Sequence, residues 1–359
     1  MIILQILVIA LLFTIVVGVH ELGHFLFARW RGMEVEEFAI GFGKKIFCTK
    51  CSKGTEYCLR AIPLGGFVRI KGMEPKPDGS ETQISRGFYS RGLGSRALVL
   101  FAGPLFSILF GYLFFFGEIA AFGRKDAPII GEVSGGSAAE KAGLKPGDKI
   151  VAVDAKRIER FTEIRGLVQE SKGKELKLTV ERASRRLQVP VSPTYEKVQI
   201  PQEFKDDPGV NDLPAKQFQL GVKPAPSVPV GLGEAAALAY DNTKMIISET
   251  ASVLMNPARL KKEAGGIISI GKAAGQAVEY GVPYFISIAA LISVSLGLIN
   301  LLPIPLMDGG QLMVVLVETL RGGRRLSLRT QEVLGVVGIV MIGILFISVT
   351  YLDIGRLLD

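Results

Sequence analysis

The residues most able to do chemistry in this 359-residue chain are its only two histidines, His20 and His24, and the acid Glu21. On a helix, positions four apart share one face, so both imidazoles could bind one metal ion while Glu21 stands beside it. Such a set is suited to metal-assisted hydrolysis, with the carboxylate moving the proton of a water molecule. Residues 2–19 carry no charge, and ionisable groups at the end of so apolar a segment usually have a function.

The apolar segment before the motif is one of four that could cross a bilayer. Hydrophobic residues make up 48% of the chain, and its mean hydropathy is positive. We expect spans within residues 1–27, 96–121, 282–310 and 333–352. The first lacks a basic start and a cleavage site, which favours a retained span over a signal peptide.

Basic residues gather in the segments 28–95 and 311–332, which predicts that both lie in the cytoplasm and that both termini lie outside. The net charge of +8 is dispersed. No basic motif interleaved with aromatic residues accompanies it, so we expect no binding of nucleic acid.

This topology brings a third candidate ligand to the two histidines. The first and third spans run in the same direction, so their ends lie on the same side of the membrane. Just past the third span, two prolines interrupt the helix and a double glycine follows Asp308. Asp308 could therefore complete a three-ligand site with a fourth position left for water. The alternatives are a turn residue for Asp308 and a polar packing cluster for Glu21. Glu118 and Asp353 would lie on the opposite side.

His20-Glu21-Leu22-Gly23-His24, the Asn300 to Gly310 block and the domain between them resemble the site-2 protease family of intramembrane zinc metalloproteases, in its bacterial sigma-E-regulating branch. The resemblance implies one Zn²⁺ per chain held by His20, His24 and Asp308, with Glu21 as general base. It implies a bacterial inner-membrane enzyme with its zinc site near the cytoplasmic side. Substrates would be single-span membrane proteins, such as anti-sigma factors first cut by another protease, or remnant signal peptides.

Two features are candidates for holding a substrate that has been unwound. Residues 36–43 and 55–70 have strand-like composition and, by the same resemblance, form a membrane-associated β-hairpin that pairs its edge with an extended substrate. A purely structural hairpin is an equal alternative. Asn300 is similar to the family's asparagine that contacts the substrate backbone, with a hydrogen bond between helices as the alternative.

The external segment resembles a PDZ domain. Strand-like runs occur at residues 129–133, 149–153 and 176–180, and residues 136–150 carry the Ala-Gly-Leu-x-x-Gly-Asp pattern. Such domains bind an extended or C-terminal peptide by strand addition. The predicted binding strand is Ile129, Ile130, Gly131, Glu132 and Val133. The alternative is a domain that only excludes bulky proteins.

Three smaller expectations complete the interpretation. Residues 230–260 form an amphipathic surface helix broken near Asn256-Pro257, and residues 265–275 form an extended piece and a glycine-rich turn. Cys48, Cys51 and Cys58 are free thiols of a reducing compartment, with a second zinc site as the alternative. Ser107 and Gly266-Ile267 depart from the family pattern, and we expect neither to touch the metal ligands.

Together these features predict a multi-pass α-helical membrane protein of four spans, with a membrane-associated β-hairpin region and an inserted extracytoplasmic PDZ domain (α+β). The competing functions are a membrane-anchored PDZ adaptor without proteolytic activity and a metal transporter. The expected parts are a first span (1–27), a cytoplasmic-side loop with the hairpin (28–95), a second span (96–121), the PDZ domain (122–228), a surface helix and linker (229–281), a third span with the Asn/Asp motif (282–310), a cytoplasmic loop (311–332) and a fourth span (333–352).

Overall fold

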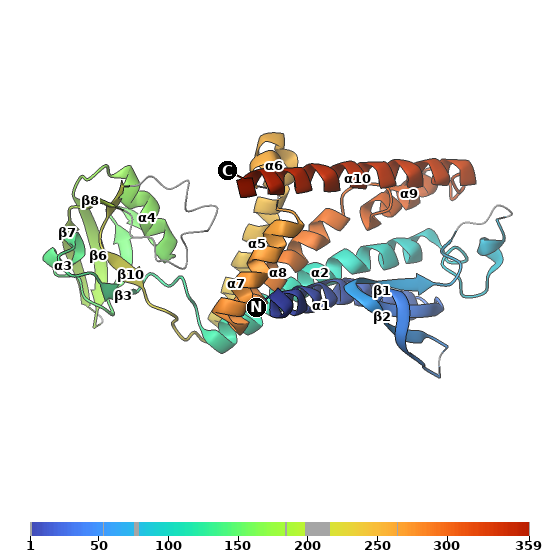
Figure 1. Ribbon diagram of the computed structural model, residues 1–359, viewed down its shortest axis with the longest axis horizontal. Coiled ribbons are helices and arrows are strands. Elements are labelled where there is room, and N and C mark those ends of the chain that lie inside the picture. Colours follow the sequence, from blue (N-terminus) through green and yellow to red (C-terminus); the bar gives the residue numbers. More distant parts are fainter. Residues whose placement is uncertain are drawn as a thin grey trace. The chain divides into compact units, whose positions relative to one another are not determined.

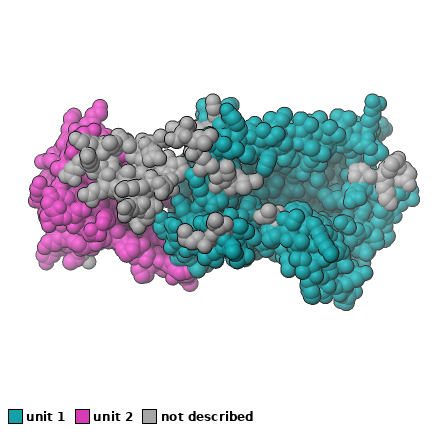
Figure 2. Space-filling view, in the orientation of Figure 1, with its two compact units in different colours: residues 1–118, 236–359 teal, residues 119–235 magenta. Residues whose placement is uncertain are grey.

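The computed structural model describes the chain except residues 1, 53, 75–78, 184, 198–215, 264 and 359. It contains two compact units, one made of residues 1–118 and 236–359 and the other of residues 119–235 (Figure 2). The first unit is a bundle of long helices with a β-hairpin, and the second contains all the other strands (Figure 1).

Four helices of the first unit are, among the described residues, long and apolar enough to cross a membrane, which confirms the predicted number of spans. They are α1 (Ile2–Trp30), α2 (Leu93–Phe122), α8 (Val282–Asn300) and α10 (Leu328–Leu358). In the most apolar stretch of α2, 44% of the residues are buried, against 6% in α10. α2 is therefore a central helix of the bundle, and α10 leaves most of its apolar surface for lipid.

Shorter helices fill the intervals of this unit: α5 (Leu232–Met255), α6 (Pro257–Glu263), α7 (Ile267–Tyr280) and α9 (Asp308–Leu320). The predicted break near Asn256 is present. The side-chain Oδ1 of Asn256 accepts hydrogen bonds from the N–H groups of Ala258 and Arg259, and Pro257 opens α6, because a proline at the first helical position gives up no hydrogen bond.

The prediction of an extended piece and a turn at residues 265–275 is wrong, because most of them lie in α7. The Asp353 carboxylate accepts hydrogen bonds from the Gly266 and Ser269 N–H groups and so satisfies the first turn of that helix. A Cβ at Gly275 would lie 3.1 Å from the Gln5 side chain. This glycine permits close packing on α1 rather than a turn.

The predicted hairpin is present as β1 (Val35–Lys50) and β2 (Glu56–Ile70), and it is more folded than two strands. Residues 37–40 of β1 pair with residues 56–59 on one side and residues 66–69 on the other. The chain bends at Gly41 and Gly43, whose φ angles of 87° and 81° favour glycine. Four segments therefore lie in the order 66–70, 35–40, 56–60 and 45–50, with 66–70 at one edge.

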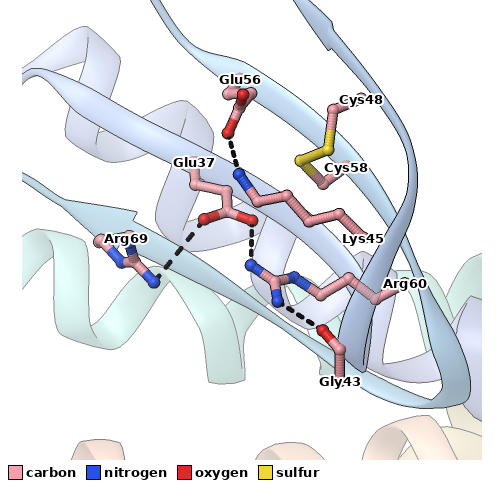
Figure 3. The surroundings of a disulfide bond; sticks show 8 residues. All are labelled: Glu37, Gly43, Lys45, Cys48, Glu56, Cys58, Arg60 and Arg69. Atoms are coloured by element: carbon pink, nitrogen blue, oxygen red, sulfur yellow. Dashed lines mark hydrogen bonds and ion pairs between the residues drawn. A yellow bond between two sulfur atoms is a disulfide. The ribbon is translucent and has the colours of Figure 1, made fainter.

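The prediction of free thiols is wrong for Cys48 and Cys58, which form a disulfide (Figure 3). The bend brings the two residues opposite each other on paired segments, with their Cα atoms 4.3 Å apart. Next to the bond, the buried Glu37 carboxylate contacts Arg60 at 2.5 Å and Arg69 at 3.7 Å (Figure 3). Cys51 remains a thiol. The alternative of a second zinc site is also disfavoured here, because two of its ligands are joined to each other.

The second unit packs short strands and two helices around an apolar core. Its elements are β3 (Ile130–Val133), α3 (Ala138–Lys141), β4 (Lys149–Val153), β5 (Lys156–Arg157), α4 (Phe161–Glu170), β6 (Leu176–Arg182), β7 (Arg185–Val191), β8 (Thr194–Lys197), β9 (Lys216–Gln219) and β10 (Val222–Pro224). The sheets are β5-β4-β6-β7, β10-β3 and β8-β9. Ile130, Ile150, Leu178 and Val180 are fully buried in the core.

Asp148, the acid of the Gly-Asp pattern in the sequence, links distant segments of this unit by hydrogen bonds. Asp148 is 1% exposed and accepts hydrogen bonds from Arg182 at 2.6 Å and from the Lys145 N–H at 2.9 Å. Burial alone would raise the pKa of Asp148, but these hydrogen bonds outweigh it and lower the pKa below its ordinary value.

Candidate metal centre

His20 and His24 lie one turn apart on α1 and are both buried, at 6% and 9% exposure. Their Nε2 atoms are 3.3 Å apart. The Nδ1 atom of His24 donates to the Val99 carbonyl at 2.8 Å, and the Nδ1 atom of His20 lies 3.0 Å from the Ser107 Oγ. A proton held at Nδ1 leaves a lone pair at Nε2, so these contacts aim both Nε2 atoms at one point.

Asp308 reaches the same point from the first residue of α9. Its Oδ2 lies 3.1 Å from the His20 Nε2 and 3.4 Å from the His24 Nε2. Although it is buried, this oxygen makes no well-formed hydrogen bond with any residue that the structure describes. Two imidazole nitrogens and one carboxylate oxygen thus converge in a buried place, and a cation would satisfy all three. The donor set is one that zinc takes at catalytic sites.

The double glycine after Asp308 permits a close backbone approach at the start of α9. Both glycines lie in the first turn of α9. A Cβ at Gly309 would lie 2.2 Å from the Leu301 carbonyl oxygen, and one at Gly310 would lie 2.2 Å from that of Ile304. The preceding loop is therefore folded directly onto the start of α9, and this packing fixes the depth of Asp308.

Helix α2 covers the histidine pair and leaves no space for a side chain. A Cβ at Gly103 would lie 2.2 Å from the His24 Nε2 and 2.9 Å from the His20 Cε1. A Cβ at Gly23 would lie 2.3 Å from the Ala102 carbonyl oxygen, so the two helix backbones are in direct contact. Gly23 and Gly103 therefore let the two helices approach closely and form a wall of the site itself.

The expectation that Ser107 does not touch the proposed ligands is wrong. Ser107 is fully buried, its hydroxyl contacts His20, and its carbonyl accepts a hydrogen bond from Ser293 on α8. We missed it because the helix-to-helix register could not be predicted from the chain. The available signal was the spacing of four between Gly103 and Ser107, which places both on the face that meets α1.

Glu21 and Asn300 stand beside the three converging atoms. The Glu21 carboxylate lies near the backbone of Val68, in the edge segment of the hairpin. Asn300 ends α8, and its Nδ2 lies 3.5 Å from the His20 Nε2. The two rival acids are engaged elsewhere, because Glu118 accepts a hydrogen bond from Ser287 and Asp353 binds the start of α7.

Comparison with known proteins decides the family. The model of "Peptidase family M50" matches residues 8–345. The chain belongs to peptidase family M50, the site-2 proteases. It is 33% identical to a protein of Agrobacterium fabrum over 97% of this chain and 95% of the relative, and 32% identical to one of Campylobacter jejuni over 97% and 92%. It is 28% identical to "Zinc metalloprotease RasP" of Geobacillus kaustophilus over 96% of each. The names of the first two also contain the words zinc metalloprotease.

This M50 peptidase is therefore a zinc-dependent protease with several membrane-spanning helices. The zinc cofactor agrees with the donor atoms found in the structure. When bound, zinc would act as a Lewis acid on a carbonyl and would make water acidic enough to lose a proton near neutral pH. The adaptor and transporter alternatives are disfavoured by the family.

In the second unit, the predicted peptide-binding strand 129–133 is paired on one side with β10, and its role in binding stays a prediction. The Ile130 N–H and carbonyl are bonded to Asp148 and Gly147, and the Ile129 carbonyl accepts from Ala225. Val133, Glu132 and Ile130 pair with β10. The backbone of residues 129–133 is thus largely engaged within the unit. Among the described strands, β3 and β10 pair only with each other, so each is an edge strand of this two-stranded sheet, and Ile129 forms an isolated bridge with Lys149.

Proposed function

We propose that this M50 peptidase cuts peptide bonds inside the transmembrane segments of single-span membrane proteins. In this proposal His20, His24 and Asp308 hold one zinc ion, and Glu21 is the general base that takes a proton from water and passes it to the leaving amide nitrogen. Asn300 stands close enough to His20 to orient a substrate carbonyl beside the same centre.

The observation that carries this proposal is the convergence of the His20 and His24 Nε2 atoms with the Asp308 Oδ2, beside Glu21 and the edge of the hairpin. Residues 66–70 form an edge segment whose inner side pairs with residues 35–40. Val68, in this segment, lies near the Glu21 carboxylate. A substrate that adds to this edge as a strand would lie against Glu21, with its backbone hydrogen-bonded to the hairpin. That arrangement suits a transmembrane helix that must be unwound, because its freed N–H and C=O groups need partners in lipid.

The second unit fits this function as a PDZ domain placed outside the bilayer. In this proposal an extended segment of a trimmed substrate adds to the β3–β10 pair, which contains most of the predicted binding strand 129–133. Substrates would be proteins whose external parts another protease has removed, such as anti-sigma factors, and remnant signal peptides form a second class.

The proposed location is the bacterial cytoplasmic membrane, with both termini and the second unit outside and the zinc site near the cytoplasmic side. The basic segments 28–95 and 311–332 support this orientation. The Cys48–Cys58 disulfide argues in the other direction, because such bonds persist in oxidising surroundings. In the cytoplasm the bond would be open to reduction.

The test uses the purified full-length chain and a single-span substrate that lacks its external domain. Glu21→Gln should lower the cleavage rate by about 10²–10⁴-fold, the usual contribution of a general base, while zinc per chain stays unchanged. Glu36→Gln, at an exposed carboxylate of the hairpin, is the matched control and should cleave at the native rate. Mass spectrometry of the products places the cut.

Cleavage by the Glu21→Gln variant at the native rate would exclude Glu21 as the base. A cut outside the transmembrane segment would overturn the proposed substrate class but not membership of the family. A chelator should abolish cleavage in both outcomes, because the enzyme is zinc-dependent.

A further inference from the structure

A cavity of about 390 Å³ lies in the first unit, and its lining is distinct from the metal centre. Its walls come from the start of α2, from α9, from the first turns of α10 and from the loop before Asp308. His20, Glu21, His24 and Asp308 are not among the residues that line it. The proposed catalytic function therefore leaves this cavity unexplained.

One end of the cavity is polar: the buried Arg96 lines it, and the half-buried Arg325 contacts Tyr89, another lining residue. Arg96 is 5% exposed and donates to the fully buried Glu318 at 2.7 Å. Arg325 lies 3.9 Å from the ring centroid of Tyr89, which lines the cavity, and pairs with Glu81. The Nε–H groups of both arginines are buried and make no hydrogen bond within the described part of the chain. Two donors at this end thus lack an acceptor oxygen.

The rest of the cavity is apolar and lies deeper along the helices. Arg96 is in the first turn of α2, and Leu100 follows it one turn later, about 6 Å along the axis at 1.5 Å per residue. On α10, Gln331 is in the first turn, and Leu334 and Gly335 come next. The polar groups therefore gather at the helix ends and the apolar groups toward the middle of the spans. An amphiphile with its head at the helix ends matches this order.

Charge around the polar end favours an anionic head. Residues 321–329 contain four arginines and no acid. Arg321 and Arg324 are exposed, so they add positive potential that Glu318 and Glu81 do not neutralise. Basic pockets between membrane helices attract anionic lipid headgroups in this way. The largely unburied α10 forms one wall, which leaves the cavity next to lipid.

We propose that this cavity binds an anionic phospholipid, with its phosphate at the Arg96 and Arg325 end and one acyl chain among Leu100, Leu334 and Gly335. The loop residues Pro303, Pro305 and Leu306 line the same cavity shortly before Asp308. The acyl chain would therefore support the loop that positions the third proposed metal ligand. This site goes beyond the peptidase function and does not depend on it.

The test measures lipid retained by the full-length protein after exchange into detergent, with native mass spectrometry. Long-chain phosphatidylglycerol, phosphatidylcholine of the same chains, short-chain phosphatidylglycerol and inorganic phosphate are compared. Long-chain phosphatidylglycerol should bind best, because each buried CH₂ of a lipid chain adds about fourfold in affinity. Inorganic phosphate should neither bind measurably nor displace it.

Two pairs of variants place the lipid. Gly335→Phe fills the cavity and should lower lipid retention several-fold. Gly343→Phe on the same helix lies outside the cavity and should leave retention unchanged. The two changes are matched, because a Cβ at either glycine meets no atom within 4 Å. Replacing both Arg321 and Arg324 by Gln should weaken binding by about 25-fold at about fivefold per arginine. The same change at the exposed Arg185 and Arg186 of the second unit is the control.

Equal retention by the Gly335→Phe and Gly343→Phe variants would overturn the site, as would equal binding of phosphatidylcholine. Saturation by inorganic phosphate alone would show a simple anion site instead. Crosslinking of a substrate peptide to the cavity, lost in Gly335→Phe, would show a substrate channel. Because binding is measured without cleavage and also in the Glu21→Gln variant, failure here is distinguishable from failure of the proposed function.

Discussion

Replacing Gly103 by alanine should remove zinc from the enzyme without unfolding it. The added Cβ would lie 2.2 Å from the His24 Nε2, about 1.2 Å short of the 3.4 Å at which ordinary contact begins. Zinc sites tolerate about 0.2 Å in ligand distance. The α2 backbone is in direct contact with α1 at Gly23, so the imidazole must move instead. We expect zinc affinity to fall by at least about 10–100-fold, the loss seen when the support of a ligand is removed.

Gly117→Ala is the matched control, because it makes the same change in the same helix where a Cβ meets no atom within 4 Å. Both variants gain about 1 kcal/mol in helix propensity, but only Gly103→Ala displaces a buried ring, so its thermal unfolding temperature should fall slightly while that of Gly117→Ala should not. Zinc per chain is measured by atomic emission after dialysis against graded chelator, together with cleavage of the truncated substrate. If Gly103→Ala retains as much zinc as Gly117→Ala, α2 does not lie against the histidine pair.

Three further predictions follow from other contacts. Ser107→Ala should weaken zinc binding by about 10–100-fold, because His20 loses its Nδ1 partner; the same chelator titration checks this, and unchanged affinity would contradict it. Because the pKa of Asp148 is lowered in the folded state, its contribution to stability should be complete above the unfolded pKa of about 3.9 and lost as pH falls through the folded value. Hydrogen exchange of the second unit measures this, and Arg182→Gln should flatten the dependence. Cys58→Ser should speed exchange in residues 45–50, since closing the short loop is worth about 3 kcal/mol; unchanged exchange would show that the disulfide constrains nothing.

The sequence was sufficient to predict that His20, His24 and Asp308 converge, and to predict the number of candidate spans, for reasons of periodicity and direction. Helical spacing places His20 and His24 on one face, and the odd-numbered spans end on the same side, which brings Asp308 to the same depth. The structure brings these three side chains together. Their role as zinc ligands stays a prediction until zinc binding is measured in variants.

Features that depend on side-by-side packing could not be predicted. Ser107 reaches His20 only because α2 lies against α1 in one rotational register, and nothing local in the chain fixes that register. Glycine is common in turns, which led us to predict a turn at residues 265–275, yet Gly275 allows close contact with α1. Cys48 meets Cys58 because β1 bends between glycines and pairs twice, an arrangement with no periodic signal. In the second unit, the pairing of β3 with β10 joins segments about 90 residues apart, and no local pattern indicated that partner.

Helix α2 carries Val99, Gly103 and Ser107 at intervals of four, and all three face the histidine pair. Val99 offers its carbonyl to His24, Gly103 leaves room for both rings, and Ser107 offers its hydroxyl to His20. The spacing of these residues along α2 therefore determines which group faces each histidine. A single residue inserted after Leu105 would turn Ser107 by about 100° relative to Gly103. Length is therefore constrained here as strictly as composition, and this segment should tolerate some substitutions but no insertion or deletion.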